Sequence, residues 1–185
     1  MQLYQQLLRT QSESTLKTTV LKLKIIKNSN RNHMELQIRK ALESEINILL
    51  EFEQGIVEAE RPFDNSLKAG EIHYYDLIEL IRSDKAEVLL AVINDEIVGS
   101  GYAKILKAKP YQKFEEYAYL GFMYVKPTFR GHGINQKILD RLIEWSKEKG
   151  MTEVKLDVYD ENEIAKKAYL KAGFKPNLLE MRFEI

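Results

Sequence analysis

The feature that most constrains the fold is a strand that leads through a short glycine-containing loop into a helix, between Tyr117 and Gly150. Residues 117–125 are largely apolar at both odd and even positions, which is typical of a strand covered on both faces, and Pro127 then ends it. Apolar residues recur at helical spacing over 133–149, and Gly150 follows as a typical helix end. A covered strand followed by a helix predicts helices packed on a sheet.

The remaining apolar patterns predict further strands and helices around this unit. Alternation predicts strands at 21–26 and 180–185, and other strand-like apolar runs predict strands at 87–93, 97–103 and 154–159, with a tight hairpin turn at 94–96. Helical spacing predicts helices at 32–50, 72–81 and 162–172, and 61–66 is a turn-rich connection. The expected fold class is therefore α/β, a mixed central sheet with an antiparallel hairpin and a β-α-β crossover, flanked by about four helices.

Length and residue pattern also predict the domain organisation. A chain of 185 residues fits one domain, and no repeat of fixed period is present. Residues 1–19 are mostly polar and are expected to form an N-terminal appendage. We therefore expect a single domain over residues 20–185.

The composition excludes several classes of function. The 28 Lys and Arg balance the 28 Asp and Glu, so there is no overall basic field to bind nucleic acid or an anionic membrane. The chain has no cysteine, which removes disulfides, cysteine-ligated metals and a thiol nucleophile. His33, His73 and His132 lack metal-ligand spacing, so no metal is expected. Without a leader pattern or an apolar run of about 18 residues, the expected location is cytoplasmic.

The loop between the covered strand and the helix, residues 125–135, is the best candidate for a binding site. Unpaired N–H groups and the positive end of the helix dipole favour a phosphate there, and Gly131 and Gly133 let it approach because they lack a Cβ atom. The alternative is that the two glycines only turn the chain. The segment after Gly133 lacks the Lys-Ser/Thr of a P-loop, and Gln136 stands where a dinucleotide fingerprint needs its third glycine. A nucleotide triphosphatase and a Rossmann dehydrogenase are therefore not indicated.

Two motifs, taken together, resemble those of the GNAT superfamily of acyl-coenzyme-A-dependent N-acetyltransferases. Residues 125–134 read V-x-P-x-x-R-G-x-G-I and are similar to the superfamily's pyrophosphate-binding motif. Residues 162–174 read N-x-x-A-x-x-x-Y-x-K-x-G-F and resemble its second motif. The similarity covers about residues 20–185 and leaves residues 1–19 unexplained. Asn135 departs from the usual Gly or Ala, and its side chain could either crowd the diphosphate or donate a hydrogen bond to it.

The resemblance implies that acetyl-CoA is the cosubstrate and that three parts of the chain bind it. The backbone of Met123, Tyr124 and Val125 would pair with the pantetheine arm, and Asn162 would contact the coenzyme near its pantetheine. The loop after the strand would wrap the pyrophosphate. The loop residues concerned are Arg130, Gly131, His132, Gly133, Ile134 and Asn135. Histidine in this loop is expected to point to solvent or to a phosphate and not to act as a base.

An amine that attacks a thioester directly needs aligned reactants, hydrogen bonds to the oxyanion and two proton transfers. Tyr169 matches the position of the family's proton donor, and its phenol could protonate the departing thiolate; the alternative is a ring packed in the core. Asp157 matches a strand position that carries a general base in some relatives; the alternative is a solvated carboxylate or one paired with a lysine. Tyr117, Tyr119 and Tyr124 are expected to pack on the sheet, with an aromatic binding platform as the alternative.

The sequence therefore predicts a transferase that moves an acetyl group from acetyl-CoA to a primary amine in a ternary complex. The acceptor, a small molecule or a protein amine, stays open. Four acidic residues would suit a cationic amine, with simple solvation as the alternative: Glu58, Glu60, Asp64 and Asp76. A non-catalytic acyl-CoA-binding or regulatory module is the alternative from another class, and an enzyme for longer acyl chains is the alternative among enzymes. A homodimer is compatible with the sequence, whereas nucleic acid and membrane partners are not expected.

Overall fold

A computed structural model of the chain describes residues 35–183 and 185. Contacts divide the chain into two units, and every described helix and strand lies in the second unit, Leu36–Ile185. The predicted appendage at 1–19, the predicted strand at 21–26 and His33 lie outside the described residues.

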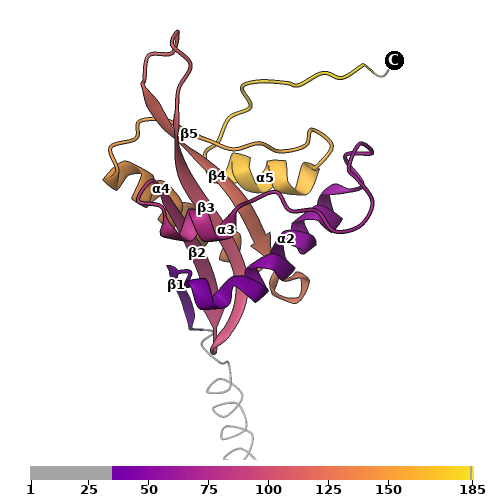
Figure 1. The fold of residues 1–185 in the computed structure, drawn as a ribbon, viewed down its shortest axis with the longest axis vertical. Helices are drawn as coiled ribbons and strands as arrows, with labels where there is room; N and C mark the ends of the chain where they lie inside the picture. The colour runs from indigo at the N-terminus through magenta and orange to yellow at the C-terminus, as the bar shows by residue number, and fades with distance from the viewer. Residues whose placement is uncertain (1–34, 184) are drawn as a thin grey trace, which may run out of the picture. The chain divides into compact units, whose positions relative to one another are not determined.

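The unit Leu36–Ile185 is built on a five-stranded mixed sheet in the order β1-β2-β3-β4-β5 (Figure 1). The pairs β1–β2, β2–β3 and β3–β4 are antiparallel, whereas β5 runs parallel to β4. The strands are β1 (Leu36–Lys40), β2 (Ala86–Ile93), β3 (Glu96–Lys107), β4 (Glu116–Val125) and β5 (Val154–Lys155). The predicted fold class, a mixed sheet flanked by helices, is confirmed.

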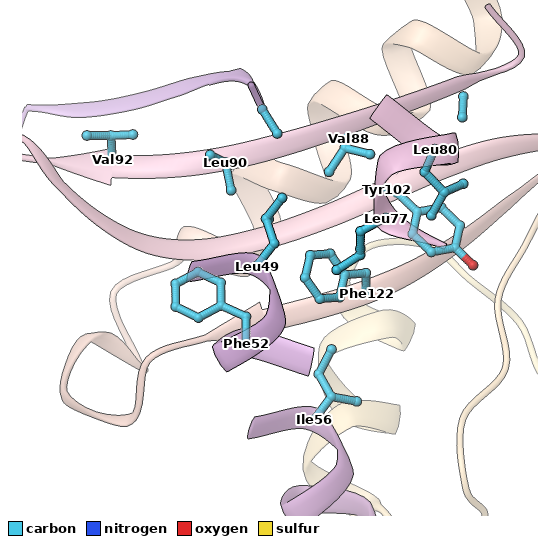
Figure 2. Packing of buried hydrophobic residues seen from close by; sticks show 12 residues of the cluster. Leu49, Phe52, Ile56, Leu77, Leu80, Val88, Leu90, Val92, Tyr102 and Phe122 are labelled. Carbon is cyan, nitrogen blue, oxygen red and sulfur yellow. The ribbon is translucent and has the colours of Figure 1, made fainter. Parts of the chain in front are cut away.

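The described residues form four α-helices, which cover both faces of the sheet. They are α2 (Ile46–Glu60), α3 (Leu77–Arg82), α4 (Ile134–Glu148) and α5 (Glu163–Lys171). Figure 2 shows the core on one face, where side chains from α2 and α3, such as Phe52 and Leu77, meet Leu90 and Phe122 of the sheet. A second buried cluster contains the apolar side of α4, and α5 packs against it. β2 lies between the two clusters and is buried along its whole length, which explains its nearly continuous apolar sequence.

The β2–β3 hairpin confirms the tight turn predicted from the sequence. Asn94 and Asp95 adopt φ angles of +49° and +64°, the left-handed region that two-residue hairpin turns require. Asn and Asp tolerate this region better than other residues with a side chain, so the turn follows from local chemistry.

The helix predicted at 32–50 is wrong in its first part. Residues 36–40 form β1, which pairs with β2, and α2 begins only at Ile46 after a short 3₁₀ turn, Glu43–Glu45. Leu36 and Ile38 pack against the buried cluster that contains the apolar side of α4. Their two-residue spacing puts them on one face of a strand, although the wider apolar pattern also fits a helix. Pairing with β2 decides between the two, and the chain switches to helix where the Glu45 carboxylate accepts a hydrogen bond from the Leu42 N–H at 2.8 Å.

Two other predicted elements are shorter than expected. The helix predicted at 72–81 begins at Leu77, because the buried Glu53 carboxylate accepts hydrogen bonds from the N–H groups of Tyr74 and Tyr75 at 2.7 and 3.0 Å and holds that segment out of a helix. The strand predicted at 154–159 pairs only at Val154–Lys155.

The strand predicted at 180–185 is not formed in the residues that the structure describes there, 180–183 and 185. This part of the chain is extended but has no neighbouring strand. Since a strand is defined by its ladder of hydrogen bonds, an alternating sequence without a partner stays unpaired.

Candidate active site

The end of β4 presents an open backbone edge. β4 pairs with β3 as far as Val125, but with β5 only at Ala118 and Tyr119. Past that point the β5-facing edge of β4, including Met123 and Tyr124, has no strand partner in the described part of the chain. N–H and C=O groups on such an edge can bind an extended ligand in the way that a further strand would.

A bulge lies at the start of this open edge. Phe122 has a φ angle of +57°, and the register of the β3–β4 pair shifts between Ser100 and Tyr102. The Ser100 hydroxyl, which is buried, donates a hydrogen bond to the Phe122 carbonyl at 3.1 Å and so satisfies a group that the bulge removes from the ladder. Bulges bend a strand and increase its twist, which fits the loss of pairing with β5 at this point.

The loop after β4 is built as the sequence indicated. A 3₁₀ turn, Pro127–Phe129, is followed by Gly131 and Gly133 with φ angles of +80° and +76°, and Gly133 is the N-cap of α4. Apart from the adjoining residues, no atom lies within 4 Å of where a Cβ would stand at either glycine, so the backbone is open on that side. No side chain caps α4, which leaves its first N–H groups available to an anion. The glycines therefore both turn the chain and leave the backbone accessible.

The other predicted loop residues have different surroundings. The exposed Arg130 donates from Nε to the Val125 carbonyl at 3.0 Å, and the exposed His132 places Nδ1 3.2 Å from the Phe129 carbonyl. Ile134 is buried in the α4 cluster, so only its backbone can face a ligand. Asn135 is partly buried in the first turn of α4.

The second motif forms α5. The Asn162 Oδ1 accepts a hydrogen bond from the Ala165 N–H at 3.1 Å, so Asn162 is the N-cap of this helix, a role that the sequence analysis did not assign. Tyr169 packs edge-on against Phe174, with ring centroids 6.0 Å apart. Loss of solvent, and secondarily the charge of Glu60, raise the pKa of Tyr169 to about 12. The phenol is therefore neutral at neutral pH and can act as a hydrogen-bond donor.

Asp157 lies just after β5 and is bound by a tyrosine. The Tyr119 hydroxyl donates to the Asp157 Oδ2 at 2.9 Å, and no lysine pairs with this carboxylate in the described residues. Burial, and then the charge of Asp157, raise the pKa of Tyr102 to about 12 and that of Tyr119 further. Asp157 and Tyr169, the two predicted catalytic residues, are not joined by a hydrogen bond in the described chain.

The C-terminal end of α2 carries Glu60, one of the four acids that the sequence indicated as suited to a cationic amine. Glu60 is partly buried, and desolvation raises the pKa of its carboxyl group. Burial raises the pKa of Tyr74, Tyr159 and Tyr169, and the charge of Glu60 is a further cause of each increase. The Tyr74 hydroxyl is buried beside the Glu60 carboxylate, and after burial and the charge of Glu60 this contact contributes to the raised pKa of Tyr74. From the sequence, Glu60 could be named only as one of four acidic residues that would suit a cationic amine.

The other three acids of that group have partners within the protein. Asp64 accepts hydrogen bonds from Ser66, from the Tyr159 hydroxyl at 3.1 Å and from Arg182 at 2.9 Å, and the bonds from Ser66 first, then Arg182, hold its pKa well below the usual range. Glu58 pairs with Arg61, and Asp76 caps α3 through the Glu79 N–H. Glu60 has no ion-pair partner in the described part of the chain.

Three further observations concern metal sites, membrane spans and cavities among the described residues. No group of three or more His, Asp or Glu side chains within 35–183 and 185 is placed to hold a metal ion. No described helix is long and apolar enough to cross a membrane. A hollow of about 490 Å³ lies between β1, β2, α3 and α4, and it includes none of the predicted site residues.

Comparison with known proteins agrees with this geometry. The model of the Acetyltransferase (GNAT) family matches residues 52–174. A thialysine N-epsilon-acetyltransferase from Bos taurus is 40% identical over 55 residues, which cover 30% of this chain and 32% of the bovine protein. The match thus spans about a third of the length of that relative.

Solved structures show the same fold. A mutant of the BH1408 protein from Bacillus halodurans superposes with a TM-score of 0.74 at 21% identity, covering 80% of this chain and 99% of that one. A predicted acetyltransferase from Clostridium acetobutylicum, crystallised with acetyl-CoA, superposes with a TM-score of 0.63 at 21% identity, covering 80% of this chain and 96% of that one.

Proposed function

The chain belongs to the acetyltransferase (GNAT) family, and from this premise we propose that it transfers an acetyl group from acetyl-CoA to a primary amine. The observation that carries the proposal is the continuity of the open β4 edge with the loop around Gly131 and Gly133. An open strand edge followed by an accessible glycine-containing loop suits a ligand with an amide-containing arm and a diphosphate. The acetyl-CoA in the Clostridium structure supports the choice of this ligand.

The protein's backbone provides most of the proposed coenzyme contacts. The open edge at Met123, Tyr124 and Val125 pairs with the amides of the pantetheine arm, as an added strand would. The N–H groups from Gly131 to Asn135 bind the diphosphate, helped by the dipole of the 15-residue α4. Because Asn162 uses its oxygen to cap α5, its side-chain amide nitrogen is the group left to donate to the coenzyme.

Tyr169 assists departure of the sulfur in this proposal. A neutral phenol donates a hydrogen bond to the thiolate as the tetrahedral intermediate collapses and the carbon–sulfur bond breaks. Its raised pKa keeps the proton on the phenol until the sulfur carries charge.

The acceptor amine must lose a proton before or during its attack. Glu60 is the carboxylate whose charge reaches Tyr169, and Asp157 is the strand carboxylate bound to Tyr119. We place the ammonium group of the acceptor near Glu60, since a partly buried carboxylate without an ion-pair partner in the described residues gains most from binding a cation. Asp157 stays the second candidate for the base, and pH profiles of the two variants separate them.

The proposal is tested by measuring release of free CoA from acetyl-CoA across a panel of primary amines. A thiol reagent reports CoA directly, and because the chain has no cysteine the protein contributes no background. Small amines, polyamines, amino acids and N-terminal peptides make up the panel, and longer acyl-CoA thioesters are compared with acetyl-CoA using the best acceptor. We expect turnover with at least one amine.

The same proteins distinguish the enzyme from a binding module. A ligand that binds only the folded state raises the melting temperature by mass action. If acetyl-CoA raises the melting temperature but no amine releases CoA above the uncatalysed rate, the chain is an acyl-CoA-binding module and the proposed transfer is wrong.

A further inference from the structure

A buried carboxylate on α2, that of Glu53, has no part in the proposed reaction. Glu53 is fully buried, and both of its oxygens meet the segment that precedes α3. Its Oε1 accepts hydrogen bonds from the N–H groups of Tyr74 and Tyr75 at 2.7 and 3.0 Å, and its Oε2 lies 2.8 Å from the His73 Nδ1. Burying a carboxylate is costly unless such partners satisfy it. Glu53 therefore fixes residues 73–75 against α2.

Neighbouring contacts hold the same segment from two sides. The Gln54 side chain donates from Nε2 to the Ile72 carbonyl at 2.7 Å and accepts from the Ile72 N–H at 3.3 Å. The ring of Tyr75 packs edge-on against the rings of Tyr102 and Phe122 in the sheet, with centroids 5.4 and 5.5 Å away. The segment thus returns along α2 in a defined position, bound to the helix on one side and to the sheet on the other (Figure 1).

Tyr74 links Glu53 to the proposed acceptor site. Glu60 follows Glu53 by seven residues, about two helical turns, so the two lie on the same side of α2, roughly 10 Å apart along its axis. The Tyr74 N–H is bound to Glu53, and the Tyr74 hydroxyl is buried beside the Glu60 carboxylate. Burial raises the pKa of the Glu60 carboxyl group, and the contact with Tyr74 opposes this increase. Tyr74 therefore spans the two carboxylates and favours the ionised form of Glu60.

We propose that Glu53 is a positioning residue for the acceptor, because it holds Tyr74 in the place where the phenol orients the Glu60 carboxylate and keeps it ionised. Glu60 receives the ammonium group of the acceptor under the proposed function, on which this inference rests. Glu53 itself touches neither the acceptor nor the coenzyme. Its loss should therefore weaken binding of the amine and spare binding of acetyl-CoA.

Three variants of the full chain separate this role from a general effect on folding. Glu53→Leu removes both oxygens at a similar side-chain volume. Glu53→Gln keeps an oxygen that can accept from both N–H groups, so it should preserve the arrangement. Glu87→Leu is the matched control, because Glu87 is also a buried glutamate but lies on β2, where it pairs with Lys40 at 2.8 Å.

Carbon NMR of protein labelled at the ζ carbon of tyrosine reports the surroundings of the phenol without any turnover. The Tyr74 resonance is the one that Tyr74→Phe removes. We expect Glu60→Gln and Glu53→Leu both to shift this resonance, and Glu53→Gln and Glu87→Leu to leave it in place. An unshifted Tyr74 resonance in Glu53→Leu, or an equal shift in Glu87→Leu, overturns the inference whether or not the chain is an acetyltransferase.

The kinetic test uses the amine of the panel that the unaltered chain acetylates fastest. Glu53→Leu should raise the KM for this amine about tenfold or more, the effect expected for one hydrogen bond to a charged group. The kcat at saturating amine and the KM for acetyl-CoA should stay close to those of the unaltered chain, and Glu53→Gln should retain the normal amine KM. Tyr74→Phe should raise the amine KM to the same extent as Glu53→Leu. The double variant Glu53→Leu/Tyr74→Phe should be no worse than either single one, since both act through one contact.

Additive effects of the two substitutions, or a fall in kcat with an unchanged amine KM, overturn the inference. If Glu53→Leu does not fold, Tyr74→Phe carries the test, because it removes a single hydroxyl, and a normal amine KM in that variant is the refuting result. A chain that releases no CoA with any amine refutes the proposed transfer instead. The NMR comparison then still decides whether Glu53 holds Tyr74 against Glu60.

Discussion

Replacing Tyr169 with Phe removes one hydroxyl from the proposed site and leaves the ring in place. The ring makes the edge-on contact with Phe174, so the packing of α5 on the α4 cluster is retained. The melting temperature is therefore expected to change little. Only the hydrogen bond to the departing sulfur is lost.

The pKa of Tyr169 sets the size of the expected effect. At about 12, it lies roughly 3.5 units above that of a thiol near 8.5, so complete proton transfer to the thiolate is unfavourable by about 5 kcal/mol. The phenol therefore acts as a donor to the charged sulfur and does not deliver its proton in full. A hydrogen bond to a charged group is worth about 1.5–3 kcal/mol, so the rate should fall roughly ten- to a hundredfold.

The rate is measured in a single turnover, with enzyme in excess over acetyl-CoA, so that product release does not mask the chemical step. Tyr117→Phe is the matched control, because it removes the same atom at the start of β4, and it should react at the normal rate. Calorimetry should give an unchanged acetyl-CoA affinity for Tyr169→Phe.

Two results would contradict this reasoning. A normal single-turnover rate in Tyr169→Phe means that the residue is only a packing element of α5. A fall of more than about a thousandfold is typical of a full general acid, and it would mean that the bound coenzyme lowers the pKa of the phenol well below that of the free protein.

Three further predictions concern the loop and the carboxylates. Gly133→Val should abolish the rise in melting temperature caused by CoA. Gly70→Val, at a glycine outside the loop with a similar φ angle of +83°, should keep this rise. An unchanged rise in Gly133→Val refutes the loop site. Asn135→Gly should weaken CoA binding in a calorimetric titration by about 1 kcal/mol if the amide donates to the diphosphate, and tighter binding would indicate crowding instead. A general base must be ionised, so the raised pKa of Glu60 predicts that activity increases with pH at a higher pH than an ordinary Glu would give. Glu60→Gln should abolish this increase in activity, whereas Asp157→Asn should retain it. The reverse pattern makes Asp157 the base.

Elements fixed by local sequence were predictable. β4, the loop and α4 follow from a covered strand, a proline stop and a helical stripe, all read within one stretch of chain. The Asn94–Asp95 turn follows from the tolerance of these residues for positive φ. Each of these features depends on neighbours in sequence, so no knowledge of the rest of the fold was needed.

Elements fixed by distant partners were not predictable. Leu36 and Ile38 fit both a helix and an edge strand, and only pairing with β2, about 50 residues away, selects the strand. The segment 180–185 has the alternating sequence of a strand, but it has no partner strand within the described residues. Periodicity specifies which face of a segment is apolar, whereas the structure it adopts depends on what covers that face.

The difference between features set by neighbouring residues and features set by distant partners also separates the proposed coenzyme side of the site from the acceptor side. The motifs place the loop and α5 because the residues proposed to bind the diphosphate are contiguous in sequence. Glu60 could be named only as one acid among four, since Glu58, Asp64 and Asp76 look equivalent in sequence. Folding makes them different: Glu58 pairs with arginine, Asp64 receives four hydrogen bonds, and Asp76 caps a helix. Glu60 is the acid of this group without an ion-pair partner in the described residues, so in the proposed mechanism it is the group that the ammonium of the acceptor meets.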